Sequence, residues 1–149
     1  MTRPLVTVLM TVYDGEPYLQ EAVESILAQT CPNFRFLILD NASTDRSRDI
    51  IRGLDDPRID LVELPENMGQ IRALNRGLEL IDTPYLARMD ADDVSLPTRL
   101  EEQVALMERH PDLVLVGSAY YRIDEDGKLH KNRPWIVYPA HDTEIRWAM

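Results

Sequence analysis

The chain has 149 residues, 44% of them hydrophobic and 28% charged, which is enough for one domain with a buried core. This composition excludes a disordered tail, a collagen-like repeat and a coiled coil. Lys and Arg total 16 while Asp and Glu total 26, and the formal charge of −10 argues against a nucleic-acid partner, because it repels phosphate backbones. No apolar run reaches the roughly 20 residues of a membrane helix. The single Cys31 fits a reducing compartment, so we expect the chain in the cytoplasm or at the inner face of a membrane.

Strands and helices alternate along the predicted chain. Five β-rich runs predict the strands, at residues 5–13, 34–39, 59–64, 85–89 and 113–123. The first helix follows Asp14, which could cap it, and has Pro17 in its first turn. The third helix follows the turn Asn67-Met68-Gly69 and runs to about Ile81. Its predicted apolar stripe toward the core is Ile71, Leu74 and Leu78.

This order predicts the α/β class, with a Rossmann-like, mostly parallel sheet and helices on both of its faces. In such sheets ligands bind beyond the carboxyl ends of the strands, where the strand order reverses. With a strand order of 3-2-1-4, the first and fourth strands would be neighbours at that reversal. We therefore expect the functional residues at the carboxyl ends of these strands.

Polar residues do gather at the carboxyl ends of three predicted strands. They are Thr11, Tyr13 and Asp14 after the first strand, Asp40-Asn41 after the second, and the DADD run of residues 90–93 after the fourth. The first loop contains neither GxGxxG nor GxxxxGK[ST], so a backbone cradle for phosphates is not predicted. The DADD carboxylates offer another way to bind phosphates, since a divalent cation bound to their oxygens can also bind a diphosphate.

The DADD run also has structural interpretations. Asp93 and Ser95 precede a predicted helix, and we favour capping over metal binding for these two residues. A calcium loop of the EF-hand type is not favoured, because Val94 holds a ligand position and Ser95 stands where the sharp turn wants Gly. Arg88 lies two residues before Asp90 on the same strand face and could form a structural ion pair with it.

Four blocks of this sequence stand in a fixed order: VTVLMTVYDGEPYLQEAVESILAQT, FRFLILDNASTD, NMGQIRALNRGLEL and ARMDADDVSLPTRLEEQ. They resemble, in register, the successive blocks of family 2 glycosyltransferases, which have the GT-A fold. The resemblance runs from about residue 5 to 118. A DxD motif alone is a weak signal, but four blocks at the right spacing are a strong one. The resemblance implies an inverting enzyme of polysaccharide biosynthesis that moves a sugar from a nucleotide-diphosphate donor to a hydroxyl of a glycan or other acceptor.

The resemblance also implies roles for residues on the nucleobase side. It places Thr11, Tyr13 and Glu16 along that side and has Asp40 hydrogen-bonded to the base. A UDP-sugar is the favoured donor. Tyr13 has an equally good structural interpretation, in which its ring packs over the edge of the sheet.

For the diphosphate side, the resemblance implies a metal site of Asp90 and Asp92. Asp90 would hold the ribose or the water shell of the metal, and Asp92 would ligate Mg²⁺ or Mn²⁺. The helix block that approaches the donor contributes Asn67, Gly69, Arg72 and Asn75. Arg72 could equally be solvated on an exposed helix face.

Two positions depart from the family pattern near the expected donor site. Asp14 stands where the family usually has Asn, and Asn41-Ala42 stand where it usually has Asp-Gly. The first change adds a charge, and the second removes a carboxylate and a flexible residue beside Asp40. Both changes bear on the choice of nucleobase more than on the activity.

The end of the chain indicates a fragment. We expect residues 1–118 to form a nucleotide-sugar-binding half and residues 119–149 to begin an acceptor-side region that is incomplete. The final HDTEIRWAM reads like a helix stopped partway. The general base of the family is expected beyond Met149, so this chain alone should bind the donor and transfer sugar poorly or not at all.

Two other functions compete with this one. A nucleotidyltransferase shares this sheet type but usually begins with a Gly-rich, basic loop, and TVYDGEPYL is neither. A non-catalytic domain that binds a nucleotide or a partner remains open for the fragment. The sequence downstream would separate them, because an acidic base there indicates an enzyme.

Overall fold

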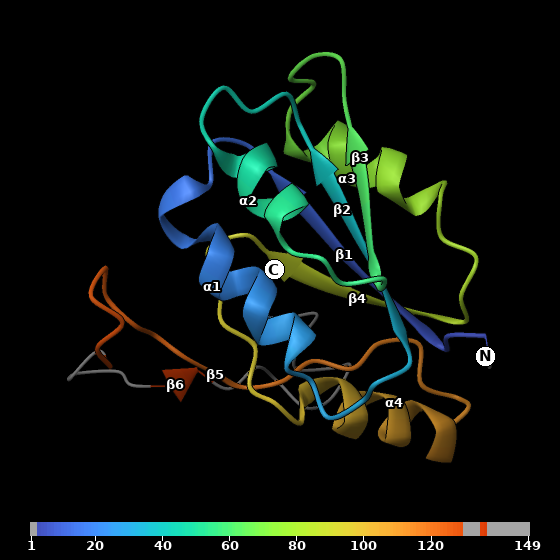
Figure 1. Cartoon of the computed structure of the whole chain (residues 1–149). Helices are drawn as coiled ribbons and strands as arrows, with labels where there is room; N and C mark the ends of the chain where they lie inside the picture. The colour runs from blue at the N-terminus through green and yellow to red at the C-terminus, as the bar shows by residue number, and fades with distance from the viewer. Residues whose placement is uncertain (1–2, 130–134, 137–149) are drawn as a thin grey trace. The chain divides into compact units, whose positions relative to one another are not determined.

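The computed structural model describes residues 3–129 and 135–136. The elements follow in the order β1 (Val6–Val12), α1 (Glu16–Leu27), β2 (Phe34–Asp40), α2 (Ser47–Gly53), β3 (Ile59–Glu63), α3 (Gln70–Leu78), β4 (Tyr85–Asp90), α4 (Arg99–Arg109), β5 (Tyr120–Tyr121) and β6 (Trp135–Ile136) (Figure 1). Contacts divide the chain into two compact units, Met1–Ala105 and Leu106–Met149. The predicted unfinished helix at the end lies outside the described residues. No helix in the described ranges is long and apolar enough to cross a membrane.

The first unit is built on a parallel sheet of four strands in the order β3-β2-β1-β4, as the sequence predicts. In the register of the sheet, Thr11 of β1 lies opposite Leu39 of β2 and Asp90 of β4. Val12 lies opposite Asp40. The carboxyl ends of the three strands that carry the polar motifs are therefore level with one another.

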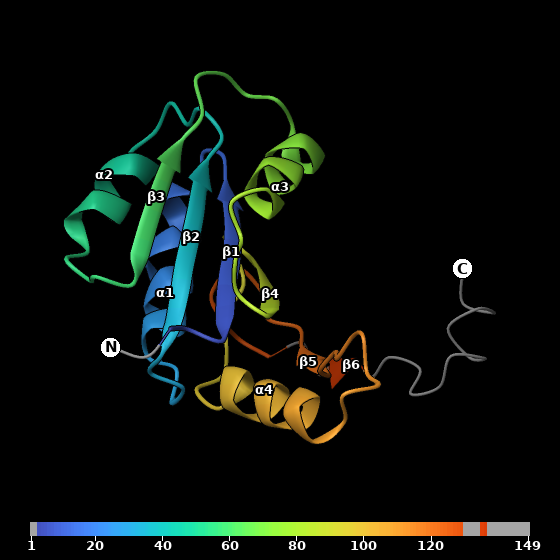
Figure 2. The same cartoon turned by 90° about the vertical axis from the view of Figure 1, so that its right-hand side faces the viewer.

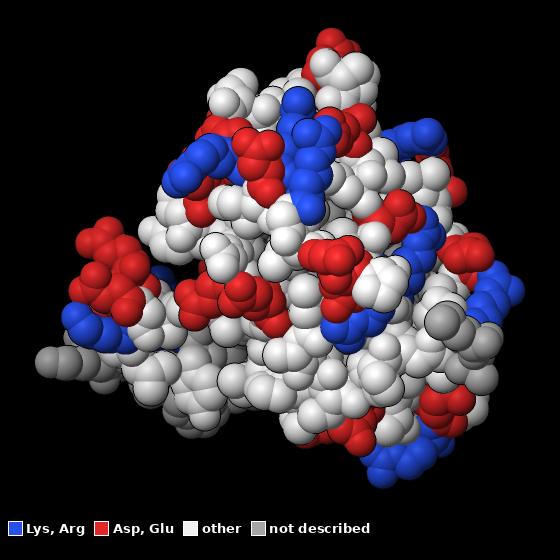
Figure 3. Space-filling model, viewed as in Figure 1, with Lys and Arg blue, Asp and Glu red and all other residues white. Residues whose placement is uncertain are grey.

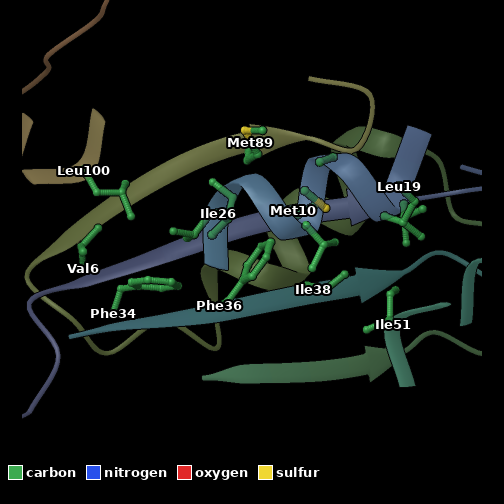
Figure 4. Close-up of a cluster of buried hydrophobic side chains, with 14 residues drawn as sticks. Val6, Met10, Leu19, Ile26, Phe34, Phe36, Ile38, Ile51, Met89 and Leu100 are labelled. Carbon is green, nitrogen blue, oxygen red and sulfur yellow. The ribbon is translucent and has the colours of Figure 1, made fainter. Parts of the chain in front are cut away.

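Helices cover both faces of this sheet, which confirms the predicted α/β class. Alternate residues of β1 and β2 pack with α1 and α2 in the larger cluster, where Met10, Leu19, Phe36 and Ile38 have no exposed surface (Figure 4). The intervening residues face the other way and pack with α3, around Leu9, Leu37 and Leu39. Figure 2 shows α1 and α2 on one side of the strands and α3 on the other. The central strands are thus apolar on both faces, as their sequences require.

The face that α3 turns to the sheet differs from the prediction. Ile71 is 76% exposed and Leu78 is 48% exposed, whereas the buried residues of the helix are Ala73 and Gly77. The reason is close packing: a Cβ added to Gly77 would lie 2.5 Å from Cδ1 of Leu9. Small residues let the helix backbone approach the sheet, so Ile71 and Leu78 of the predicted stripe lie at its outer flank, while Leu74 packs against the cluster around Leu9 as predicted.

The predicted strand over residues 113–123 is also wrong in extent and in pairing. Within the described residues only Tyr120–Tyr121 is a strand there, and it pairs antiparallel with β6 in a separate two-stranded sheet. Val114 is 95% exposed and Leu115 is 80% exposed, because no described strand pairs with residues 113–119. The turn predicted at Asp126-Gly127 is present, with Gly127 at φ 75° and its N–H bound to the carbonyl of Asp124.

Candidate functional site

A hollow of about 500 Å³ opens at the carboxyl ends of β1 and β4. Its lining residues are Thr11, Val12, Tyr13, Asp14, Gly15, Pro17, Tyr18, Asn41, Asn67, Gly69, Gln70, Asp90, Ala91 and Asp92. Six of the residues predicted from the sequence are among them: Thr11, Tyr13, Asn67, Gly69, Asp90 and Asp92. Four others do not line it: Glu16, Asp40, Arg72 and Asn75. The topology therefore brings together residues that lie in four separate sequence blocks.

Two aromatic side chains stand on the wall contributed by β1 and the start of α1. Tyr13 is 49% exposed and Tyr18 is 45% exposed, so both rings present substantial apolar surface to solvent. A half-exposed ring beside a polar hollow can stack on a planar group while its hydroxyl remains solvated. Tyr18 was not predicted from the sequence, since helical spacing alone does not distinguish it from an ordinary surface residue.

A second part of the lining is acidic and comes from the end of β4. Asp90 forms an ion pair with Arg88, as the structural interpretation of that pair predicts. Burial raises the pKa of Asp93 above its ordinary value, and the carboxylates of Asp90 and Asp92 raise it further. No three acidic, His or Cys side chains within the described residues converge into a group that could hold a metal on its own. A cation at this wall would need oxygen ligands from elsewhere in addition to Asp90 and Asp92.

Asp40, the last residue of β2, is fully buried. Its carboxylate accepts the N–H of Ser43 at 3.2 Å and the Nε–H of Arg48 at 2.5 Å. The same bond raises the pKa of the Arg48 guanidinium. Asp40 therefore stabilises the turn after β2 through Ser43, and its buried carboxylate is paired with the positive charge of Arg48.

The loop after β1 and the loop after β2 are fastened together by a set of hydrogen bonds between residues 14–16 and 43–47, here called the loop clasp. The amides of the first loop are bound by side chains of the second: Asp14 N–H by Ser43, Gly15 N–H by Ser47 and Glu16 N–H by Asp45, at 2.9 to 3.1 Å. The amides of the second loop are bound in return: Thr44 N–H by Asp14 at 2.7 Å and Arg46 N–H by Glu16 at 3.1 Å. The clasp thus satisfies amides that precede both helices and have no helical partner.

Asp14 belongs to this clasp and does not cap its own helix, contrary to the prediction. The residue before α1 is Gly15, and no side chain caps that helix from within its own segment. Asp14 adopts φ 50°, a left-handed conformation that Asp and Asn tolerate better than most residues. This conformation accompanies the hydrogen bond from its carboxylate to Thr44 of the neighbouring loop.

Glu16 lines a second hollow, together with Asp45, Arg46 and Asp49. Its carboxylate binds the guanidinium of Arg46, and these hydrogen bonds lower the pKa of Glu16. Acidic and basic side chains lie next to one another around α1 and α2 (Figure 3), consistent with this pair and with the pair Arg52–Glu63. Arg72 and Asn75 are exposed on α3.

Asn41 was not predicted as a site residue, although the sequence marked it as a departure from the family pattern. It is 3% exposed and its side chain bonds both Asn67 and the backbone of Met68. Gly69, the last residue of the turn Asn67–Gly69, adopts φ 80° directly before α3. The end of β2 is therefore tied to the turn that begins α3.

A parallel sheet of this order, with a polar hollow at the carboxyl ends and an acidic wall after β4, defines an α/β protein of the GT-A-like class. Comparison with solved structures agrees. A Staphylococcus aureus TarS fragment in complex with UDP-GlcNAc matches with a TM-score of 0.68 and 23% identity, over 71% of this chain and 32% of that one. The mannosyltransferase PcManGT from Pyrobaculum calidifontis, in complex with GDP-Man and Mn²⁺, matches with a TM-score of 0.63 and 28% identity, over 83% and 36%.

Sequence comparison is more specific. The model of glycosyl transferase family 2 matches residues 7–148. An uncharacterized glycosyltransferase of Methanocaldococcus jannaschii is 39% identical over 135 residues, which cover 88% of this chain and 47% of that protein. The amylovoran biosynthesis glycosyltransferase AmsE of Erwinia amylovora is 35% identical, over 82% and 47%. The chain belongs to glycosyl transferase family 2, and it spans about half the length of the curated relatives it matches.

Proposed function

We propose that the hollow binds a nucleotide-diphosphate sugar together with Mg²⁺ or Mn²⁺. For the whole protein we propose inverting transfer of that sugar to a hydroxyl of a glycan or other acceptor in polysaccharide biosynthesis. One observation carries the proposal: an aromatic wall at Tyr13 and an acidic wall at Asp90 and Asp92 face the same hollow. Membership of family 2, the ligands of PcManGT and the biosynthetic role in the name of AmsE support it.

On the nucleobase side, Thr11 and Tyr13 would contact the base and ribose from the end of β1. Asp40 would hydrogen-bond the base only if its buried carboxylate, which is bound to Arg48, became accessible. Its chain neighbour Asn41 lines the hollow. Glu16 would reach the donor only if its carboxylate left Arg46. We favour UDP over GDP as the nucleotide. If the chain prefers GDP, the residues to examine are Asp14 and Asn41-Ala42, where the sequence departs from the usual family pattern.

On the diphosphate side, Asp90 and Asp92 would hold the cation. The residues fit a cation, because burial raises the pKa of Asp93, the carboxylates of Asp90 and Asp92 raise it further, and a positive charge would relieve the repulsion among the three. The carboxylate of Asp90 would leave its ion pair with Arg88 and ligate the cation instead. When bound, the metal neutralises negative charge on the diphosphate. Asn67, Gly69, Arg72 and Asn75 would approach the donor from the turn before α3 and from the helix itself.

Calorimetry on this chain tests the proposal. UDP and GDP are titrated separately, each with and without Mn²⁺. We expect UDP to bind more tightly than GDP and Mn²⁺ to strengthen the binding. If neither UDP nor GDP bound in the presence of Mn²⁺, the proposed site would be refuted. We assign no catalytic base among the described residues, so we expect no sugar transfer to accompany this binding.

A further inference from the structure

We infer that Asn41 is a positioning residue that holds the turn before α3 in the shape the donor meets. The inference rests on the proposed function and concerns the same hollow. Asn41 is itself fixed to the sheet, since its backbone N–H donates to the carbonyl of Val12 at 2.8 Å. Its side chain then reaches the turn Asn67–Gly69, which lies 26 residues further along the chain.

Three hydrogen bonds form this connection. The Nδ2 of Asn41 donates to the Oδ1 of Asn67 at 3.0 Å. The Oδ1 of Asn41 accepts the backbone N–H of Met68 at 3.0 Å. The Oδ1 of Asn67 also accepts the backbone N–H of Gly69, at 2.9 Å. Both side-chain oxygens therefore bind backbone amides of the turn.

This pattern fixes the direction of the bond between the two side chains. Neither amide can be turned over, because each oxygen accepts from a backbone N–H that has no other acceptor among the described residues. Position 41 must therefore supply one donor and one acceptor, which Asn can do and ionised Asp cannot. Position 67 needs only an acceptor, which either Asn or Asp supplies. The two positions should consequently respond differently to the same isosteric substitution.

The turn held in this way presents hydrogen-bond donors to the hollow. Gly69 and Gln70 line the hollow, and no side chain caps the first turn of α3. The Nδ2 of Asn67 has no hydrogen-bond partner within the described part of the chain. Free N–H groups at the start of a helix favour anionic oxygens. The turn is therefore suited to contact the phosphates or the sugar of the donor, provided that Asn41 keeps it in place.

The experiment compares four variants with the native chain. Asn41→Asp removes the donor at position 41 and sets an anionic oxygen against the Oδ1 of Asn67, which should push the side chain away from the turn. Asn41→Ala removes both the donor and the acceptor that binds the Met68 N–H, without adding charge. Asn67→Asp adds the same charge but keeps the acceptor that the turn requires. Asn33→Asp adds the charge just before β2, away from the hollow, and also removes an amide donor, the one to the carbonyl of Arg3. It is therefore the control for net charge, for loss of a side-chain donor and for folding. For each chain, calorimetry gives the dissociation constant of UDP with Mn²⁺, and NMR gives the hydrogen exchange of the Met68 and Gly69 amides.

Both substitutions of Asn41 should accelerate exchange of the Met68 amide at least tenfold and weaken UDP binding at least tenfold, while unfolding stays cooperative. Asn67→Asp should leave exchange at Gly69 close to native, and Asn33→Asp should change neither quantity more than twofold. Native UDP affinity in Asn41→Ala would overturn the inference and leave the proposed function intact. Equal acceleration of exchange in Asn67→Asp and Asn41→Asp would overturn the directional argument. Failure of the native chain to bind any nucleotide would instead remove the proposed function.

Discussion

The carboxylate of Glu16 binds Arg46 through both of its oxygens. Oε2 accepts the backbone N–H of Arg46 at 3.1 Å, and Oε1 accepts the Nε–H of its guanidinium at 2.8 Å. The N–H of Glu16 is in turn bound by Asp45, the residue before Arg46. Two residues of the clasp, Asp14 and Gly15, also line the hollow. The hydrogen bonds of the clasp therefore hold this part of the lining in place.

This pair predicts a pH-dependent contribution to stability. The pKa of Glu16 is lowered from its ordinary value of 4.5 by hydrogen bonds from Arg46. A carboxylate with a lowered pKa in the folded state stabilises that state above its ordinary pKa, and the contribution is lost as the pH falls through the lowered value. Glu16→Gln should therefore be less stable than native at pH 7, and the difference should shrink as the pH falls below 4.5. Urea denaturation across this range measures it, with Glu21→Gln at an exposed position of α1 as the control for loss of one charge. A difference that stays constant through this range would contradict the role of the pair.

The close approach of α3 to the sheet predicts a contrast between two glycines. Gly77→Ala should lower the free energy of unfolding by about 1 kcal/mol, because the added methyl overlaps the buried side chain of Leu9 by more than helix propensity restores. Gly53→Ala, at the end of α2, meets nothing within 4 Å and should be neutral or stabilising by up to about 1 kcal/mol. Chemical denaturation of both variants decides the point. If Gly77→Ala were as stable as Gly53→Ala, the packing account of α3 would be wrong.

Ala42 is the second non-glycine residue with a positive φ, at 63°, within the described residues. A left-handed conformation costs Ala about 1–2 kcal/mol, and glycine removes that cost while losing roughly 0.4–1 kcal/mol to the freedom of its unfolded chain. Ala42→Gly should therefore raise the free energy of unfolding by about 0.5–1 kcal/mol. Ala28→Gly, at φ −82°, relieves no strain and should lower it. Thermal or urea unfolding of the pair tests this, and a loss of stability in Ala42→Gly would show that Ala42 is not strained.

Much of the architecture could be predicted because it depends on local pattern and on general rules of topology. Apolar runs predict the four strands of the sheet, and the rule for parallel sheets places Thr11, Asp40 and Asp90 at one edge of it from the sequence alone. The structure confirms the strand order and the helices on both faces. The roles proposed for individual site residues stay predictions.

The remaining features depend on contacts that a periodic pattern does not contain. The buried face of α3 is set by Gly77, whose lack of a side chain carries no hydrophobic signal. The run 113–123 has the composition of a strand, but strand formation also needs a partner, and the described residues supply a paired strand only at Tyr120–Tyr121 and a single bridge at Ile123. The hydrogen bonds of Asn41 and of the clasp join segments that lie 26 to 32 residues apart in sequence.

We propose that Asp92 binds the cation that holds a nucleoside diphosphate in the hollow. The most direct measurement is calorimetry of UDP with and without Mn²⁺ on the native chain, on Asp92→Asn and on Asp55→Asn, whose exposed carboxylate lies after α2. We predict that Mn²⁺ strengthens UDP binding at least tenfold in the native chain and in Asp55→Asn, and has no such effect in Asp92→Asn. An undiminished Mn²⁺ effect in Asp92→Asn would contradict the account.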